Sequence, residues 1–168
     1  MKFITFLLFI SCTLFAKEQT YVLLGVSIDN IDHKITANNT YKVQREQTYR
    51  INYTIGKQYE NYRYSANLLA NKEILTFVSF DYLYPSMLEG NTDAFIGISI
   101  GKAKLSTAEF GNLQTSNLYE DISSFQVGFT SNDMEFGYRH FFMNAEFKNS
   151  TYKEVIDSLQ SVYIAFKF

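Results

Sequence analysis

The sequence has only two histidines, and imidazole is the side chain that most readily ligates metals and carries out acid–base chemistry near neutral pH. His33 follows Asp29 and Asp32, and imidazole and carboxylate groups in one loop could share a metal ion. Scattered loop carboxylates are usually only solvated, so we expect no metal there. The sequence has no paired Cys/His spacing, no glycine-rich phosphate loop and no basic aromatic patch. We therefore predict no metal, no cofactor and no nucleic-acid partner.

The second histidine lies near a possible acid, Glu146. The segment 139–144, which contains His140, resembles the Arg-His-x-Ser-Asn stretch of barrel lipases that deacylate lipid A. Those enzymes use a His, a nearby Ser and an acid on the lipid-facing wall. Phe142 stands where the nucleophilic Ser would be, and a phenyl ring cannot attack an ester. We therefore predict no enzymatic activity, with His140 as an interfacial residue at the outer end of a strand.

A third group of polar residues recurs at alternate positions inside apolar segments, so its side chains share one face of a sheet. We expect a lumenal polar network of Arg50, Arg63, Asp81, Gln126, Glu135 and Arg139. Buried charges require partners, so this network could fill the interior of a closed sheet. Alternatively, the same charges could line a pore and set its ion selectivity. Eight strands enclose a space barely wide enough for side chains, which favours the filled interior.

The elements that position these residues are strands, because the dominant period after residue 17 is two. Each alternating segment is close to the ~9–11 residues that a tilted membrane strand needs. Two short stretches, around Glu109 and at Lys153–Leu159, could be helical but are assigned to loops. The strand segments are Val22–Ile28, Tyr49–Gly56, Tyr62–Leu68, Ile74–Tyr84, Ala94–Gly101, Ser124–Phe129, Met134–His140 and Ser161–Phe168.

Composition helps to choose between a membrane sheet and a soluble one. The 168 residues fit one domain, and a net charge of -2 gives no long-range attraction to nucleic acid. Aromatic residues make up 17% of the chain, yet its mean hydropathy is only -0.13. One face is branched aliphatic with Tyr and Phe near strand ends, and the other is Gly, Ser, Thr, Asn and isolated charges. This arrangement is typical of a transmembrane barrel, although a soluble sandwich shows the same period.

The first residues of the sequence predict an export signal. Lys2 precedes the apolar run Phe3–Ile10, and Ala16 precedes a polar segment, which predicts a signal peptide at 1–16 and a barrel domain at 17–168. The competing interpretation is a lipoprotein, in which Cys12 would be lipidated. Cleavage after Ala16 would leave a mature chain without cysteine, which suits an oxidising compartment.

The connections predict the strand pairing. A two-residue hairpin with Asn132 and Asp133 at its tip places Gln126 opposite Arg139 and Phe129 opposite Phe136. A tight turn near Asn71 and Lys72 places Arg63 across from Asp81, where we expect a lumenal ion pair. Longer polar stretches should form loops, with the first three of these outside the cell: Asp29–Thr48, Leu105–Ile122, Lys148–Asp157 and, of medium length, Pro85–Asp93.

Several of these segments resemble the small bacterial outer-membrane barrels related to opacity proteins. Tyr49–Leu69 resembles the hairpin of that family, Phe80–Gly101 its central strand pair, and Phe125–Phe141 its penultimate hairpin. The resemblance implies an all-β, closed, antiparallel up-and-down transmembrane barrel of about eight strands in the cell outer membrane. The last residues resemble the C-terminal signal read by the barrel-assembly machinery, and those that carry it are Val162, Ile164, Phe166 and Phe168.

The resemblance fixes no activity, because fold is not function. We expect a structural or surface-display protein that contacts outer-membrane lipids and, through its loops, surface or host ligands. One alternative is a narrow pore, and another is a soluble periplasmic barrel or lipoprotein that binds an apolar ligand inside. The aromatic residues expected at the membrane interface are Tyr49, Tyr62, Tyr82, Tyr84 and Tyr138.

Overall fold

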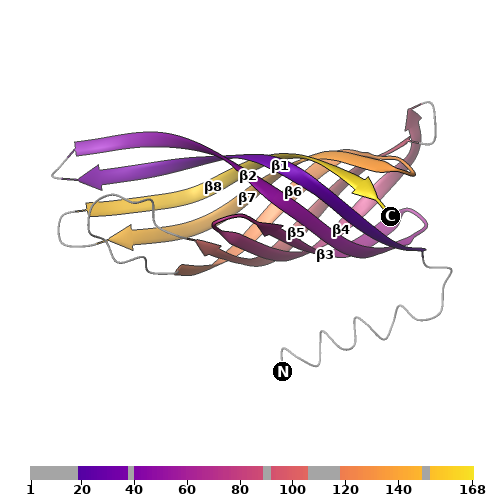
Figure 1. The fold of residues 1–168 in the computed structure, drawn as a ribbon, viewed down its shortest axis with the longest axis horizontal. Coiled ribbons are helices and arrows are strands. Elements are labelled where there is room, and N and C mark those ends of the chain that lie inside the picture. The colour runs from indigo at the N-terminus through magenta and orange to yellow at the C-terminus, as the bar shows by residue number, and fades with distance from the viewer. Residues whose placement is uncertain (1–18, 38–39, 89–91, 106–117, 149–151) are drawn as a thin grey trace, which may run out of the picture.

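The protein is a closed barrel of eight antiparallel strands (Figure 1). The computed structural model describes residues 19–37, 40–88, 92–105, 118–148 and 152–168, so the predicted signal peptide lies outside the described residues. Each strand pairs with its neighbours in the chain, and the last pairs back with the first. The strands are β1 Gln19–Ala37, β2 Thr40–Tyr59, β3 Tyr62–Ala70, β4 Ile74–Leu88, β5 Thr92–Leu105, β6 Leu118–Thr130, β7 Met134–Lys148 and β8 Tyr152–Lys167.

This architecture confirms the predicted fold class. Among the described residues there is no helix long and apolar enough to cross a membrane.

Alternation along each strand decides which side chains face the interior. On β5, Ser99 is 4% exposed, whereas Ile98 and Ile100 on either side of it are each 66% exposed. Successive side chains of a strand point to opposite faces, so the polar residue points inward and the isoleucines point outward. The alternative of a soluble barrel that binds an apolar ligand required the Tyr/Ile face to point inward, and it points outward.

The predicted registers around two turns are confirmed. Ser131 N donates to Met134 O at 2.8 Å and closes a hairpin with Asn132 and Asp133 at its tip. Gln126 pairs with Arg139 and Phe129 with Phe136 across β6 and β7. The turn between β3 and β4 consists of residues 71–73, and it places Arg63 opposite Asp81.

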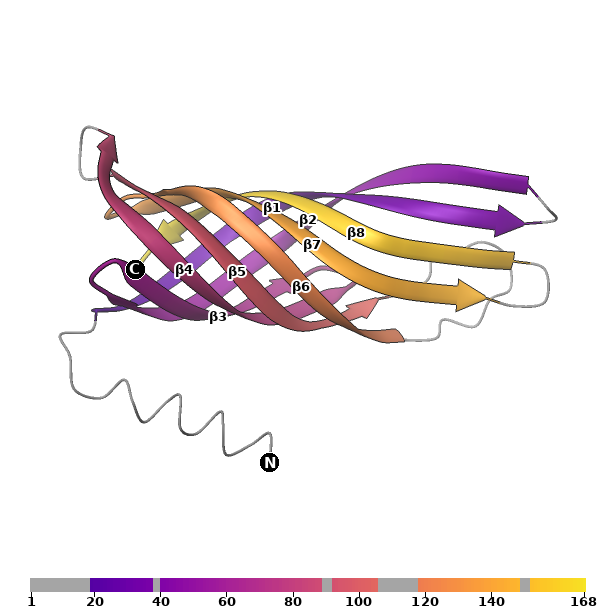
Figure 2. The same ribbon diagram turned by 180° about the vertical axis from the view of Figure 1, so that it is seen from behind.

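The barrel wall has unequal height. β2 has 20 residues and β3 only 9, so β1, β2, β7 and β8 extend past the other strands at one end (Figures 1 and 2). The C terminus lies at the opposite end, close to the start of β1. Register shifts between Ile31 and His33 and between Phe142 and Ala145 mark β-bulges near the base of this extension, and bulges bend strands.

The extension corrects several loop assignments. Asp29–Thr48 was predicted to be an outer loop, but nearly all of it continues β1 and β2, which pair from Asp29↔Thr48 to Ala37↔Thr40. Most outward side chains here are polar rather than aliphatic, with Tyr41 and Val43 as exceptions, so the apolar membrane-facing pattern ends while the strands continue. We refer to Asp29–Ala37 of β1 and Thr40–Thr48 of β2, with the adjoining parts of β7 and β8, as the outer extension.

The remaining loop predictions are partly wrong for the same reason. Tyr152–Asp157 belongs to β8, and so does the stretch Lys153–Leu159. β4 continues to Leu88 and β5 begins at Thr92, so the medium stretch Pro85–Asp93 is mostly strand. Residues 106–117, within the predicted loop Leu105–Ile122, lie outside the described residues.

Candidate functional site: the lumen and the outer extension

A network of charged and polar side chains crosses the interior of the barrel. Arg63 Nε on β3 donates to Asp81 Oδ2 on β4 at 2.6 Å, and Arg63 Nη1 donates to Glu135 on β7. Gln126 on β6 donates to Asp81. Gln126 Oε1 also accepts from Arg139 Nε at 2.9 Å. Two arginines and two carboxylates therefore balance one another, in what we call the central network.

The central network has one member that the sequence did not predict. Tyr163 on β8 donates its hydroxyl to Glu135 Oε1 at 2.6 Å, and the Arg139 guanidinium lies 3.9 Å from the centroid of its ring. Tyr163 lies inside the predicted assembly signal, at a position between the outward-facing residues. Because it alternates with outward-facing Val162 and Ile164, its side chain must point inward, and this alternation could have assigned it to the lumen.

The structure separates Arg50 from the other five predicted lumenal residues. Its guanidinium donates to Asp29 on β1 and to Glu73 in the turn between β3 and β4. Arg50 is 2% exposed and Asp29 is fully buried. The pair with Asp29 depends on the β1–β2 register, whereas the pair with Glu73 depends on the short β3–β4 turn. These two features lie far apart in the sequence.

Apolar side chains fill the lumen on both sides of the central network. Toward the termini, Arg63 lies 4.2 Å from the centroid of Phe95, which belongs to a small buried cluster. Toward the outer extension, Phe77 and Phe141 pack edge to face at 5.2 Å within a larger cluster. We call this larger cluster the outer apolar layer, and its members are Ile31, Leu69, Leu75, Phe77, Ala103, Leu105, Ile122, Phe141, Met143, Ala145, Phe147, Ile156 and Leu159.

The inner face of the outer extension carries a histidine held between two carboxylates. His33 on β1 is 4% exposed, and its Nδ1 lies 2.5 Å from Glu154 Oε1 on β8. Its Nε2 lies 3.4 Å from Glu46 Oε2 on β2, while Tyr152 donates to Glu154 at 2.8 Å. Burial lowers the pKa of His33, but the hydrogen bond and charge of Glu154, with the charge of Glu46, outweigh it and raise that pKa.

The three residues considered for a metal site do not converge. Asp29 and His33 point inward to separate partners, whereas Asp32 on the outward face accepts from Arg45 Nε at 2.8 Å. Within the part of the chain that the structure describes, no group of three or more His, Cys, Asp or Glu residues could hold a metal ion.

His140 belongs to an aromatic cluster on the outer wall. Its ring stacks on Phe125 at 5.5 Å and lies 4.6 Å from Phe142. Glu146 instead pairs with Lys148 and Lys153. The acid therefore has lysine partners, and the side chain beside His140 is a phenyl ring rather than a nucleophile.

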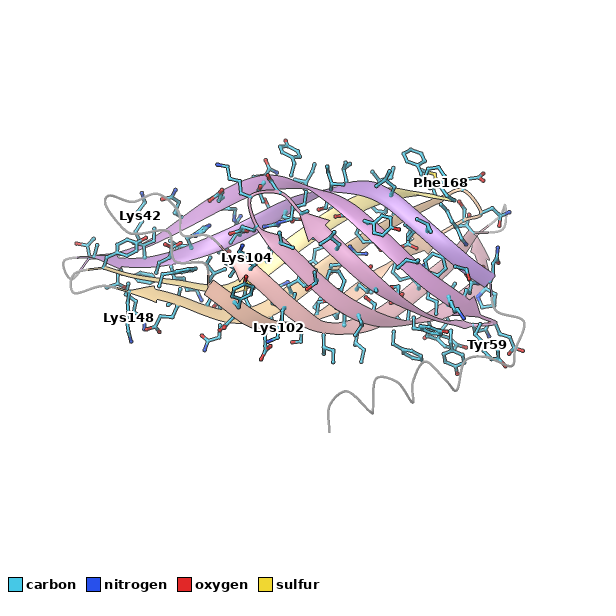
Figure 3. All side chains as sticks on the ribbon, turned by 60° about the horizontal axis from the view of Figure 1, so that its bottom comes forward. Lys42, Tyr59, Lys102, Lys104, Lys148 and Phe168 are labelled. Atoms are coloured by element: carbon cyan, nitrogen blue, oxygen red, sulfur yellow. The ribbon has the colours of Figure 1, made fainter. Side chains whose placement is uncertain are left out.

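The expected interfacial aromatics lie on the outer wall at different heights. Tyr62 and Tyr82 pack edge to face at 5.2 Å, and Tyr82 contacts Tyr84 at 4.8 Å. This group lies beside the β2–β3 turn, at the end marked by Tyr59 in Figure 3. Tyr49 lies near the other end of the short strands, and Tyr138 pairs with Val127 and Val162 in the wall.

The residues of the predicted assembly signal all point outward. Val162, Ile164 and Phe166 are between 38% and 56% exposed, and Phe168 is 77% exposed. Phe168 also joins the barrel through its backbone, because its N–H donates to Val22 O at 2.9 Å and its carbonyl accepts from Val22 N at 3.2 Å.

Comparison with solved structures identifies the fold. The chain resembles outer membrane protein H of P. aeruginosa, whose structure was solved in DHPC micelles, with 20% identity and a TM-score of 0.51. The match covers 88% of this chain and 99% of that one. The fold is that of a small outer-membrane barrel. Neisserial surface protein A also matches, with 14% identity, a TM-score of 0.49, and coverage of 90% and 99%.

The outer-membrane barrel fold agrees with the sequence-based resemblance. No family model and no curated protein matches the chain.

Proposed function

We propose that this protein is a non-conducting outer-membrane barrel that displays its outer extension at the cell surface. The observation that carries the proposal is the filled lumen beneath strands that continue beyond it. An isolated polar layer could admit ions, but here Arg63 is paired with Asp81 and Glu135, and an apolar layer lies directly above them. Water and ions would have to cross both layers, and an eight-stranded barrel has little remaining cross-section.

The outward face supports the membrane location. Exposed aliphatic side chains surround the barrel at the level of the central network, and lipid is the solvent that such a band requires. Beyond this band the outward side chains become charged and paired, as in Asp32–Arg45 and Lys34–Asp157. Solvated ion pairs of this kind belong in water rather than in hydrocarbon.

The conduction part of the proposal is tested in planar lipid bilayers with the refolded protein. We expect no channel activity from the unchanged chain. The double variant Phe77→Ala/Phe141→Ala, which removes the paired rings of the outer apolar layer, should show conductance and so establish that insertion is detected. Conductance of the unchanged chain at the level of this variant would contradict the sealed lumen.

The display part is tested by surface labelling of intact cells, with Cys12 replaced by Ser. Lys42→Cys, in the outer extension, should react with a membrane-impermeant maleimide. Asn132→Cys, in the β6–β7 turn at the other end, should react only after the membrane is broken. Both positions are exposed in the structure. Labelling of Asn132→Cys alone in intact cells would show that the barrel is inserted in the opposite orientation.

A further inference from the structure

The outer part of β2 has a strand on only one side. Its ladder with β3 ends at Ile51↔Ala70, whereas its ladder with β1 continues to Ala37↔Thr40. No other described strand pairs with Thr40–Arg50. The second backbone edge of this segment, which we call the β2 edge, therefore has no strand partner within the described residues.

The hydrogen-bonding direction along this edge follows from one contact at its base. Asn71 Nδ2 donates to the Tyr49 carbonyl at 2.6 Å, so the peptide groups of Tyr49 face away from β1. In an antiparallel strand the N–H and C=O of one residue point to the same side, and alternate residues point to opposite sides. The β1–β2 register is continuous, so Tyr41, Val43, Arg45 and Gln47 present their peptide groups to the β2 edge.

The β2 edge lacks two of the usual protections of edge strands. It contains no proline, and the pairing with β1 has no bulge that would twist it away. Its outward side chains include Tyr41, 63% exposed, and Val43, 50% exposed. Asn71 already shows at Tyr49 that the edge accepts a hydrogen bond from a group placed where a strand would continue.

We propose that the β2 edge binds an extended peptide segment of another protein by β-strand addition. Main-chain hydrogen bonds would supply the affinity, and side chains on alternate positions the selectivity. One face of the added strand would lie beside Tyr41 and Val43, which favours apolar residues. The other face would lie beside Lys42, which is exposed at the far end from Phe168 (Figure 3) and favours an acidic residue.

The proposal rests on the display role proposed above, because the segment must lie outside the membrane. A second copy of this chain is a less suitable occupant. Two copies inserted in the same direction and related by an axis along the membrane normal would bring their β2 edges together in parallel. Parallel pairing is slightly less stable than antiparallel pairing, whereas a free peptide can bind in the antiparallel sense.

The experiment is backbone amide hydrogen exchange measured by NMR on the full barrel in detergent micelles. The probe is a synthetic peptide of alternating Thr and Val with one Glu placed to meet Lys42. Without peptide, the amides of Val43, Arg45 and Gln47 should exchange fast, while those of Gln44 and Glu46 are protected by β1. Addition of the peptide should protect the first group and leave the second unchanged.

Two variants at one position separate backbone pairing from other binding. Val43→Pro removes an N–H from the β2 edge without removing a hydrogen bond to β1, and it should abolish the peptide-induced protection. Val43→Thr keeps the N–H and should retain that protection. Unchanged protection of Gln44 and Glu46 in both variants shows that the β1–β2 hairpin is intact.

Three results would overturn the proposal. They are protection of Val43, Arg45 and Gln47 before the peptide is added, absence of any peptide effect, and equal binding by Val43→Pro. Protection before addition that increases with protein concentration would indicate pairing between copies. If Lys42→Cys is still labelled on intact cells, the display role survives any of these results and only the peptide site is lost.

Discussion

The Arg139 guanidinium stacks on the ring of Tyr163, and the hydroxyl of the same tyrosine donates to Glu135. One side chain thus contacts a cation through its face and an anion through its oxygen. Because Tyr163 lies on β8 and both partners lie on β7, these contacts join the last two strands of the barrel inside the lumen.

Tyr163→Phe should separate these two contacts. The ring and its contact with Arg139 are kept, whereas buried Glu135 loses one of its donors. A hydrogen bond to a charged group contributes about 1.5–3 kcal/mol, so we expect a loss of unfolding free energy of that order. Urea unfolding in micelles, followed by heat-modifiable gel mobility, measures it. An unchanged unfolding midpoint would show that the hydroxyl contributes nothing.

Arg63→Gln should be more damaging, because it leaves Asp81 and Glu135 buried without their shared cation. Breaking a buried ion pair by removing one partner costs about 3–5 kcal/mol. The double variant Arg63→Gln/Glu135→Gln removes one uncompensated charge and should recover part of the loss in the same urea assay. Additive effects of Arg63→Gln and Glu135→Gln, with no recovery, would argue against the pairing shown by the structure.

The sequence predicted those features that depend on neighbouring strands. The pairs Arg63↔Asp81 and Gln126↔Arg139 each cross a single short turn, so the turn length sets the register. The eight alternating segments predicted the barrel for a similar reason, because the period is a local property of the chain.

The features that the sequence did not predict depend either on closure of the barrel or on strands that continue past the membrane-facing segments. The contacts of Glu154 with His33 and of Asp29 with Arg50 require the β1–β8 register or a strand continuation that the membrane pattern does not show. The outer extension was assigned to loops because most of its outward residues are polar. In water a strand needs no apolar outward face, and pairs such as Arg45–Asp32 occupy that face instead.

The outer extension should be more stable in mild acid than in mild alkali. The pKa of His33 is raised in the folded protein above its ordinary value of 6.5, so protonated His33 stabilises the fold fully below pH 6.5. That contribution is lost as the pH rises through the folded-state pKa. The groups facing His33 are Glu46 on β2, Glu154 on β8 and, at longer range, Glu73.

Exchange of the β1 amides near His33, corrected for the intrinsic pH dependence of exchange, measures this effect. We expect protection to decrease between pH 6 and pH 8 in the unchanged protein. His33→Gln can still hydrogen-bond Glu154 but does not titrate, so its corrected protection should be independent of pH over the same range. A decrease of equal size in His33→Gln would assign the effect to another group.

Phe168→Ala should distinguish a role in assembly from a role in stability. The Phe168 side chain is 77% exposed to the surroundings of the barrel, and its contact with β1 is made by backbone atoms that alanine also provides. Removal of a largely exposed side chain should therefore change the urea midpoint of the refolded barrel only slightly.

If the barrel-assembly machinery reads the terminal ring, as the resemblance of the C-terminal residues implies, the variant should accumulate unfolded in the periplasm of expressing cells. Lys167→Ala, one position away with an inward side chain, is the matched control and should assemble normally. Equal amounts of heat-modifiable barrel in outer membranes from the two variants would rule out recognition of Phe168, whereas a large loss of stability in micelles would make the residue structural.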